Sequence, residues 1–208
     1  MEIGIVTDSF AHLPFERMLD TVAGLGLTAV ELPTGGWSSA PHLDLAALLG
    51  DAGERDRYLG ALRERGLHVS ALNINGNQLH PVIGGRIDEL VHRTVDLAEL
   101  MGVGTVVLMS GLPAGAPGDR TPNWVTTSWP PETQEILDYQ WNEVAIPYWR
   151  LLARYGEERG VRFAVEMHGD QLVYNTATLL RLREAVGDVV GANLDPSHPM
   201  WMGADPRA

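Results

Sequence analysis

The amino-acid sequence predicts an α/β protein, an incomplete (β/α)8 TIM barrel in which about six βα units are present. Three observations lead to this prediction. Short β-branched runs alternate with segments of helical period, no two runs are joined as a hairpin, and carboxylates stand where several runs end.

Six apolar runs are predicted to be strands. Their apolar residues occupy consecutive positions rather than every second one, which is typical of strands buried on both faces of a parallel sheet. The six runs cover residues 2–8, 27–33, 68–74, 105–111, 162–168 and 189–195.

Five segments between or beside these runs have the period of amphipathic helices. The first follows Pro14, and all five segments meet a glycine at their C-terminal end, where glycine commonly terminates a helix. The fifth begins at Asn175, whose side chain suits a helix N-cap. The five segments cover residues 14–26, 51–66, 86–101, 131–160 and 175–187.

This order of elements fits either a doubly wound open sheet or a (β/α)8 barrel, since both join parallel strands through right-handed helical crossovers. The turn after the first run reads TDSFAHLPF and lacks the GxGxxG of dinucleotide-binding sheets. A barrel also predicts polar groups at the carboxyl ends of several strands. The sequence has these groups, which favours the barrel.

Composition excludes several classes of protein. The chain has 208 residues, of which 45% are hydrophobic, so it can form one domain with a sizeable core. No run approaches the roughly 18 apolar residues of a membrane span, and the N-terminus lacks the pattern of a signal peptide. We therefore expect a cytoplasmic protein without a membrane partner.

The ionisable residues limit the chemistry further. The chain has no cysteine, and all 15 of its basic residues are arginine, so thiolate, Schiff-base and P-loop lysine chemistry are excluded. Its formal net charge of −12 argues against a nucleic-acid partner and suits a small neutral or polar substrate. Carboxylates, imidazoles, hydroxyls or a metal must carry any catalysis.

Four carboxylates stand at the predicted strand ends, where a barrel places its active site. Glu166 is the strongest case because it interrupts an apolar strand, and a carboxylate there needs a metal, an arginine or a proton. His168, two residues later, lies on the same face as Glu166 and is a candidate for substrate binding. As an alternative, each carboxylate could cap a helix or pair with an arginine. The four residues are Asp8, Glu31, Glu166 and Asp195.

Asp195 and His198 form a D-x-x-H pair in LDPSHP, directly after the sixth run. Pro196 stiffens the turn, so both side chains can converge on one ion or one substrate hydroxyl; an Asx turn is the alternative. Together with Glu166 they predict a divalent metal site of oxygen and imidazole ligands. Such ligands favour Mn²⁺, our first expectation, or Mg²⁺ or Co²⁺, and they allow Zn²⁺.

Loops after the strands offer further candidates for substrate binding. His80 follows the third run, and an exposed loop histidine is the alternative there. Trp37 lies in the loop after the second run, and Trp124 and Trp129 lie in the long loop after the fourth. Indoles in such loops can stack on sugar rings, or they can simply anchor the loop to the barrel rim. The remaining histidines considered, His12, His42 and His92, are expected to be structural.

With these residues in place, the chain resembles the xylose isomerase-like TIM-barrel superfamily, which includes sugar phosphate isomerases and epimerases, ketose 3-epimerases and endonuclease IV-type enzymes. The resemblance covers the whole chain, through GIVTDSF, AVELPTGGW, VEMHGD and NLDPSH. In that family the fifth-strand glutamate and the sixth-strand aspartate bind metal, which implies this role for Glu166 and Asp195. The family's D-x-x-H histidine contacts substrate or a second metal, which implies a catalytic role for His198.

The chain departs from the family at its C-terminal end. Family members complete the metal site with residues of a seventh and an eighth strand, which are not found here. Asp205 is predicted to cap a sixth helix whose first residue would be Pro206. We therefore expect residues 1–208 to be one xylose isomerase-like domain that lacks strands seven and eight, and to represent part of a longer barrel.

The resemblance implies a divalent-metal-dependent isomerase or epimerase that moves a proton through an enediolate of a sugar or sugar phosphate. Glu166 would bind metal and act as a base, and His198 would hold a substrate oxygen. One alternative is the metal subunit of a carbon–carbon lyase that cleaves oxidised C-glycosides. An endonuclease IV-like phosphodiesterase and an inactive fragment are further alternatives. The expected partner is a small carbohydrate, with a homo-oligomer or a second subunit left open.

Overall fold

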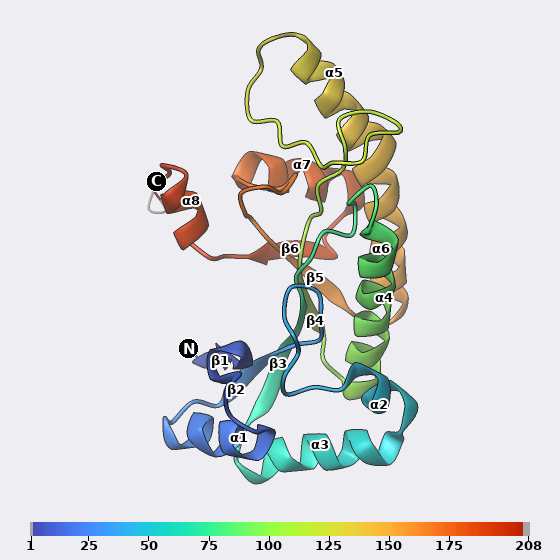
Figure 1. Ribbon diagram of the computed structural model, residues 1–208. Coiled ribbons are helices and arrows are strands. Elements are labelled where there is room, and N and C mark those ends of the chain that lie inside the picture. The colour runs from blue at the N-terminus through green and yellow to red at the C-terminus, as the bar shows by residue number, and fades with distance from the viewer. Residues whose placement is uncertain (1, 206–208) are drawn as a thin grey trace. The chain divides into compact units, whose positions relative to one another are not determined.

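The computed structural model describes residues 2–205 and shows an α/β chain with six strands (Figure 1). The strands form one sheet in the order β1-β2-β3-β4-β5-β6, and the pairs β1–β2, β2–β3 and β5–β6 are parallel. The predicted class is therefore confirmed. The strands are β1 (Gly4–Val6), β2 (Ala29–Pro33), β3 (His68–Ile74), β4 (Thr105–Met109), β5 (Arg162–Glu166) and β6 (Val190–Asn193).

Two compact units make up the chain. The first unit consists of Met1–Asn75, Leu90–Val107 and Arg159–Val161. The second unit consists of Gly76–Glu89, Leu108–Glu158 and Arg162–Ala208.

The first unit is built from β1 to β3, their helices and most of α4. Asp51 caps α3 by accepting hydrogen bonds from the backbone N–H groups of Gly53 and Glu54, at 2.7 and 3.2 Å. Apolar faces of α1 and α4 and the residues of β2 and β3 form its core. The helices are η1 (Thr7–Phe10, a 3₁₀ helix), α1 (Phe15–Gly24), α2 (Leu45–Gly50), α3 (Ala52–Glu64) and α4 (Gly84–Met101).

The second unit carries the helices that follow β4 and β5. Trp149 is fully buried, stacks edge-on against Phe163 at 6.0 Å between ring centroids, and donates its indole N–H to Ser110 O at 3.0 Å. Asn175 caps α7 in a capping box with Thr178, as the sequence predicts for this residue. The helices are α5 (Glu132–Asp138), η2 (Tyr139–Ala145, a π-helix), α6 (Ile146–Glu158), α7 (Thr176–Val186) and α8 (Ser197–Trp201).

The structure corrects several predicted boundaries. The first strand ends at Val6, so Asp8 lies in η1 rather than at a strand end, because residues 7–10 form 3₁₀ hydrogen bonds. The single helix expected over residues 131–160 is interrupted by the π-helical turns of η2. Neither the short helix α2 nor the short helix α8 was predicted.

Two further expectations concern the C-terminal end of the chain and membrane-spanning helices. The helix expected to begin at Pro206 lies outside the described residues. Among residues 2–205, no helix combines the length and the apolar character that crossing a membrane requires.

Candidate metal centre

The register between β5 and β6 brings three predicted ligands to one place in the second unit. Glu166 is the last residue of β5 and pairs with Asn193, the last residue of β6. Asp195 therefore follows at the same edge of the sheet, and α8 begins two residues later and carries His198. The unpredicted α8, rather than a turn stiffened by Pro196 alone, positions the histidine.

Distances within the cluster are short enough for one ion. Glu166 Oε1 lies 3.1 Å from His198 Nε2, and Asp195 Oδ2 lies 3.4 Å from the same nitrogen. One ligand atom from each of the three residues lies within 4.8 Å of the others. Asn193 Nδ2 donates to the second oxygen of Glu166 at 3.4 Å. The three residues that the sequence predicts as metal ligands thus lie together in the structure.

The Glu166 carboxylate is buried, and a buried negative charge needs a compensating partner. Glu166 is only 8% exposed, and its carboxylate oxygens contact the Asn193 amide and the His198 imidazole. A carboxylate buried this deeply is costly unless a positive charge compensates it. A divalent cation held by Glu166, Asp195 and His198 would supply that charge, so the residues fit the predicted metal.

The surroundings of the Asp195 carboxyl favour its ionised form. The backbone N–H of Ser197 donates to Asp195 Oδ1 at 2.8 Å. Hydrogen bonds from the side chain and the backbone of Ser197 lower the pKa of Asp195, with smaller contributions from His198 and His168. Because a metal binds the deprotonated carboxylate, this lowered pKa favours metal binding in competition with protons.

His168 lies beside the cluster. Its ring is 4.1 Å from the ring of His198 between centroids, with 58° between the two planes. His168 Nδ1 lies 2.5 Å from the carbonyl oxygen of Gly169. A carbonyl oxygen can only accept, so Nδ1 carries the proton. The structure places His168 against one of the three ligands, as its position two residues after Glu166 predicts.

Trp124 borders a cavity next to the helix that carries His198. Its ring meets Tyr174 edge-on at 5.6 Å between centroids, and a methyl group added at Gly169 would lie 3.6 Å from its Cη2 atom. The cavity has a volume of about 550 Å³, and its lining includes Trp124, Tyr174 and, from α8 and its end, Pro199 and Met202. Of the predicted tryptophans, Trp124 is thus the one that this structure places near the cluster.

The other predicted substrate contacts do not line this cavity. Trp129 is 73% exposed in the loop before α5, and its backbone N–H donates to Thr127 Oγ1 at 3.3 Å. Trp37, in the first unit, is 59% exposed. His80 Nδ1 accepts the backbone N–H of Val82 at 3.1 Å, which gives this histidine a role in shaping the turn before α4.

The two carboxylates of the first unit that the sequence predicted at strand ends are held by polar neighbours, Asp8 in η1 and Glu31 in the middle of β2. Ser38 Oγ donates to Asp8 at 2.9 Å, and Asn73 Nδ2 donates to Glu31 at 2.6 Å. These partners were not predicted, and neither were Asn193, Ser197 and Tyr174 in the second unit. A signal for Asn193 was available, because it is the last residue of its strand and directly precedes Leu194 and Asp195.

Comparisons with known proteins agree with this architecture. An uncharacterized protein, YfiH, of Bacillus subtilis strain 168 is 51% identical over 210 residues, which cover 99% of this chain and 67% of that protein. The chain thus spans about two thirds of the length of this relative.

Solved structures show the same fold at lower identity. The probable 3-DHS dehydratase AsbF of Bacillus anthracis, involved in petrobactin synthesis, has a TM-score of 0.69 and 18% identity, over 99% of this chain and 67% of that one. A D-psicose 3-epimerase, solved in the presence of D-fructose, has a TM-score of 0.66 and 13% identity over the same shares.

The family comparison covers nearly all of the chain. Residues 19–208 match the family described as "Xylose isomerase-like TIM barrel". Strands β2 to β6 lie within this match, and β1 precedes it. The chain therefore belongs to the xylose isomerase-like TIM-barrel family.

Proposed function

We propose that the protein is a divalent-metal-dependent isomerase or epimerase of a sugar or sugar phosphate. One observation carries the proposal: Glu166, Asp195 and His198 offer ligand atoms within 4.8 Å of one another at the ends of β5 and β6. A cluster of this kind at the carboxyl end of parallel strands is where this fold holds its catalytic groups. Among the neighbours in fold, one is a D-psicose 3-epimerase.

The proposed reaction is a proton transfer through an enediolate. A bound divalent cation would lower the pKa of the C–H group next to a substrate carbonyl. Glu166 would bind the cation through one oxygen and accept the proton through the other, which lies 3.4 Å from the Asn193 amide nitrogen. Asp195 would be a second ligand, and His198 a ligand and a contact of the substrate oxygen.

We assign His168 and Trp124 to substrate binding. His168 packs against His198, and its protonated Nδ1 is fixed by Gly169, so its ring has a defined orientation beside the ligands. Trp124 offers an aromatic wall to the cavity beside α8, suited to the apolar face of a sugar ring. His80, Trp37 and Trp129 stay predicted substrate contacts.

We propose Mn²⁺ as the first metal to test, with Mg²⁺, Co²⁺ and Zn²⁺ as alternatives. Two carboxylates and one imidazole, without any thiolate, form a donor set of mainly hard ligands. Metal content after incubation with each ion separately, followed by dialysis, would rank the four.

A second candidate function is the cleavage of an oxidised C-glycoside by a carbon–carbon lyase reaction. The cavity beside α8 favours it, because about 550 Å³ and an aromatic wall can hold a group larger than a monosaccharide alone. The first step, removal of a proton next to a carbonyl, would use the same residues. The two functions therefore differ in their substrate and not in their metal site.

The test compares substrates on one preparation. The purified protein with Mn²⁺ is incubated in D₂O with D-fructose and D-psicose, and deuterium incorporation next to the carbonyl is followed by NMR. A 3-oxo C-glycoside is tested in parallel for release of its aglycone. Exchange with the ketoses supports the epimerase, and aglycone release supports the lyase. Neither reaction in a protein that has bound its metal would contradict both.

A matched pair of variants shows whether Glu166 is responsible. Glu166→Gln keeps the size of the side chain but loses its charge, and it should lower turnover by more than about 100-fold, the upper cost of losing even an indirect metal contact. Glu157→Gln, at an exposed position of α6, makes the same chemical change away from the site and should retain activity. Equal activity of both variants would contradict the assignment.

A further inference from the structure

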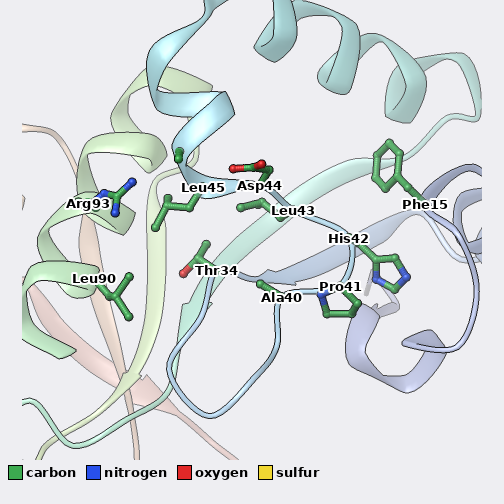
Figure 2. Close-up of a pocket in the computed structure, with 11 residues that line it drawn as sticks. Phe15, Thr34, Ala40, Pro41, His42, Leu43, Asp44, Leu45, Leu90 and Arg93 are labelled. Atoms are coloured by element: carbon green, nitrogen blue, oxygen red, sulfur yellow. The ribbon is translucent and has the colours of Figure 1, made fainter. Parts of the chain in front are cut away.

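A second cavity lies in the first unit, formed by the loop after β2, the start of α2 and one face of α4. Its volume is about 540 Å³, within the range of small-molecule sites. Figure 2 shows Leu90 and Arg93 of α4 on one side and residues 40–45 on the other. None of the three candidate metal ligands lines it.

The loop wall of this cavity is held in a fixed conformation. Ala40 adopts a left-handed backbone, with φ of 49°, which is uncommon for a residue other than glycine and is found at ligand-binding loops. Ser38 Oγ accepts the N–H of Ala40 at 2.9 Å, and Leu43 N donates to Ala40 O at 3.2 Å. Tyr58 further anchors the loop by donating its hydroxyl to His42 O at 3.1 Å. The wall is therefore preformed.

Arg93 presents a positive charge to the cavity without a partner. The side chain is half-buried, and no side chain or backbone group of residues 2–205 forms an ion pair or hydrogen bond with it. Arg93 differs from an exposed arginine in that its guanidinium is half-buried and lines a cavity. A planar guanidinium in this setting suits a carboxylate, which it can bind through two parallel hydrogen bonds.

The rest of the lining limits the ligand. Phe15, Pro41, Leu43, Leu45 and Leu90 give the cavity apolar walls. Asp44 also lines the cavity, and its carboxylate, which caps α2 through the N–H of Ala47 at 3.0 Å, disfavours a dianion such as phosphate. These walls suit a ligand with one negative charge and an apolar body.

His42 adds a polar acceptor to the same lining. It is 5% exposed, and its Nε2 lies 3.0 Å from Leu13 O, so Nε2 carries the proton and Nδ1 is an acceptor. Within the described residues, this buried Nδ1 has no hydrogen-bond partner. Buried polar atoms are rarely left without a partner, so this nitrogen is an unusual feature of the cavity wall.

From these observations we propose that the cavity binds a small monocarboxylate with an apolar body, held by Arg93. Its lining residues belong to the first unit, whereas the three candidate metal ligands belong to the second. The proposal does not depend on the proposed isomerase activity, and the site is a second one for a ligand other than the sugar.

Phenylacetate is a suitable probe, with 2-phenylethanol as its uncharged analogue and inorganic phosphate as an anion without an apolar body. Titration at about 0.15 M salt screens the protein's net negative charge. In ¹H–¹⁵N NMR spectra, phenylacetate should give saturable shifts at the amides of residues 40, 42–46 and 90–93. The analogue should bind at least about tenfold more weakly, the cost of one charge-assisted contact, and phosphate should not saturate.

Two pairs of variants locate the site. Arg93→Gln should weaken phenylacetate binding by about tenfold or more, whereas Arg86→Gln, an exposed position on the same helix that does not line the cavity, should not. Ala46→Phe places a ring in the cavity and should abolish binding, whereas Ala47→Phe, at the next exposed position, should preserve it.

The phenylacetate titrations can either support the proposed site or contradict it. Saturable shifts at the cavity that are lost in Arg93→Gln or Ala46→Phe and kept in the matched controls support the proposal. If phenylacetate fails to saturate, shifts residues away from the cavity, or binds Ala46→Phe as well as the unaltered protein, the proposal is wrong. Binding should also persist in Glu166→Gln, so a negative result here leaves the proposed metal-dependent function standing.

Discussion

The Glu166 carboxylate and the His198 imidazole meet at 3.1 Å between Oε1 and Nε2, although 32 residues separate them in the sequence. Pairing of β5 with β6 sets the position of Glu166, and the short helix α8 sets that of His198. Both atoms face Asp195, so the three side chains can share one cation. This contact is the basis for the predictions that follow.

His198→Ala is expected to weaken Mn²⁺ binding by more than about 100-fold, because it removes a ligand rather than a residue that only orients one. Isothermal titration calorimetry of the metal-free protein measures this directly. His12→Ala, at an exposed position of the first unit, is the matched control and should bind as the unaltered protein does. Unchanged affinity of the His198 variant would remove this residue from the ligand set.

Ser197→Ala should raise the pKa of Asp195. The Ser197 side chain and backbone N–H together hold that pKa below its ordinary value, and the variant loses the side-chain hydrogen bond while keeping the backbone one. A carboxyl group with a lowered folded-state pKa stabilises the fold above its unfolded pKa, and this contribution is lost as the pH falls through the folded value. In the variant this contribution should therefore be smaller, and its loss should be complete at a higher pH.

The measurement for Ser197→Ala is an NMR titration of the Asp195 side-chain carboxyl in both proteins without metal. Metal affinity offers a second readout: it should match the unaltered protein at neutral pH and fall below it only in acid. An identical Asp195 titration in the two proteins would show that Ser197 does not control this carboxyl.

Trp124→Ala is expected to raise KM for the substrate while leaving Mn²⁺ affinity unchanged. The ring lines the cavity beside α8 but supplies no metal ligand, so its loss removes a binding surface and not the charge chemistry. Steady-state kinetics and metal titration together test this separation. Trp129→Ala, which removes an indole that is 73% exposed, provides the comparison. An equal effect of the two substitutions would argue against a specific role for Trp124.

Trp149→Ala should destabilise the protein by about 3–5 kcal/mol, because it leaves a large cavity in the core of the second unit and an unpaired Ser110 carbonyl. Trp201→Ala, where the side chain is 90% exposed, should change stability by no more than about 0.5 kcal/mol. Urea unfolding followed by circular dichroism compares the two. Similar losses of stability would contradict the packing described for Trp149.

Much of the fold was predictable because it rests on local patterns. The consecutive apolar residues of RFAVE and TVVLM identified buried parallel strands, and the capping residues Asn175 and Asp51 identified helix starts. Other elements depend on contacts between residues that are far apart in the sequence. The π-helix at Tyr139–Ala145 interrupts a continuous helical pattern, and the five residues of α8 are too short for a periodic signal.

The ligands of the candidate site could be predicted from the sequence, but the residues around those ligands could not. Glu166, Asp195 and His198 are chemically unusual for the places where they stand, so the sequence singles them out. Asn193, Ser197 and Tyr174 are ordinary polar residues whose importance comes from strand register and from α8, which only the structure reveals. His168 was predicted by strand period, but the orientation of its ring depends on Gly169.

The most direct test of the metal centre is an anomalous difference map from crystals of the protein soaked in Mn²⁺. We predict one strong peak within about 2.5 Å of a carboxylate oxygen of Glu166, a carboxylate oxygen of Asp195 and Nε2 of His198. The same peak should be absent from crystals of Glu166→Gln and present in those of Glu157→Gln. A peak elsewhere, or none in crystals of the unaltered protein at saturating Mn²⁺, would contradict the account.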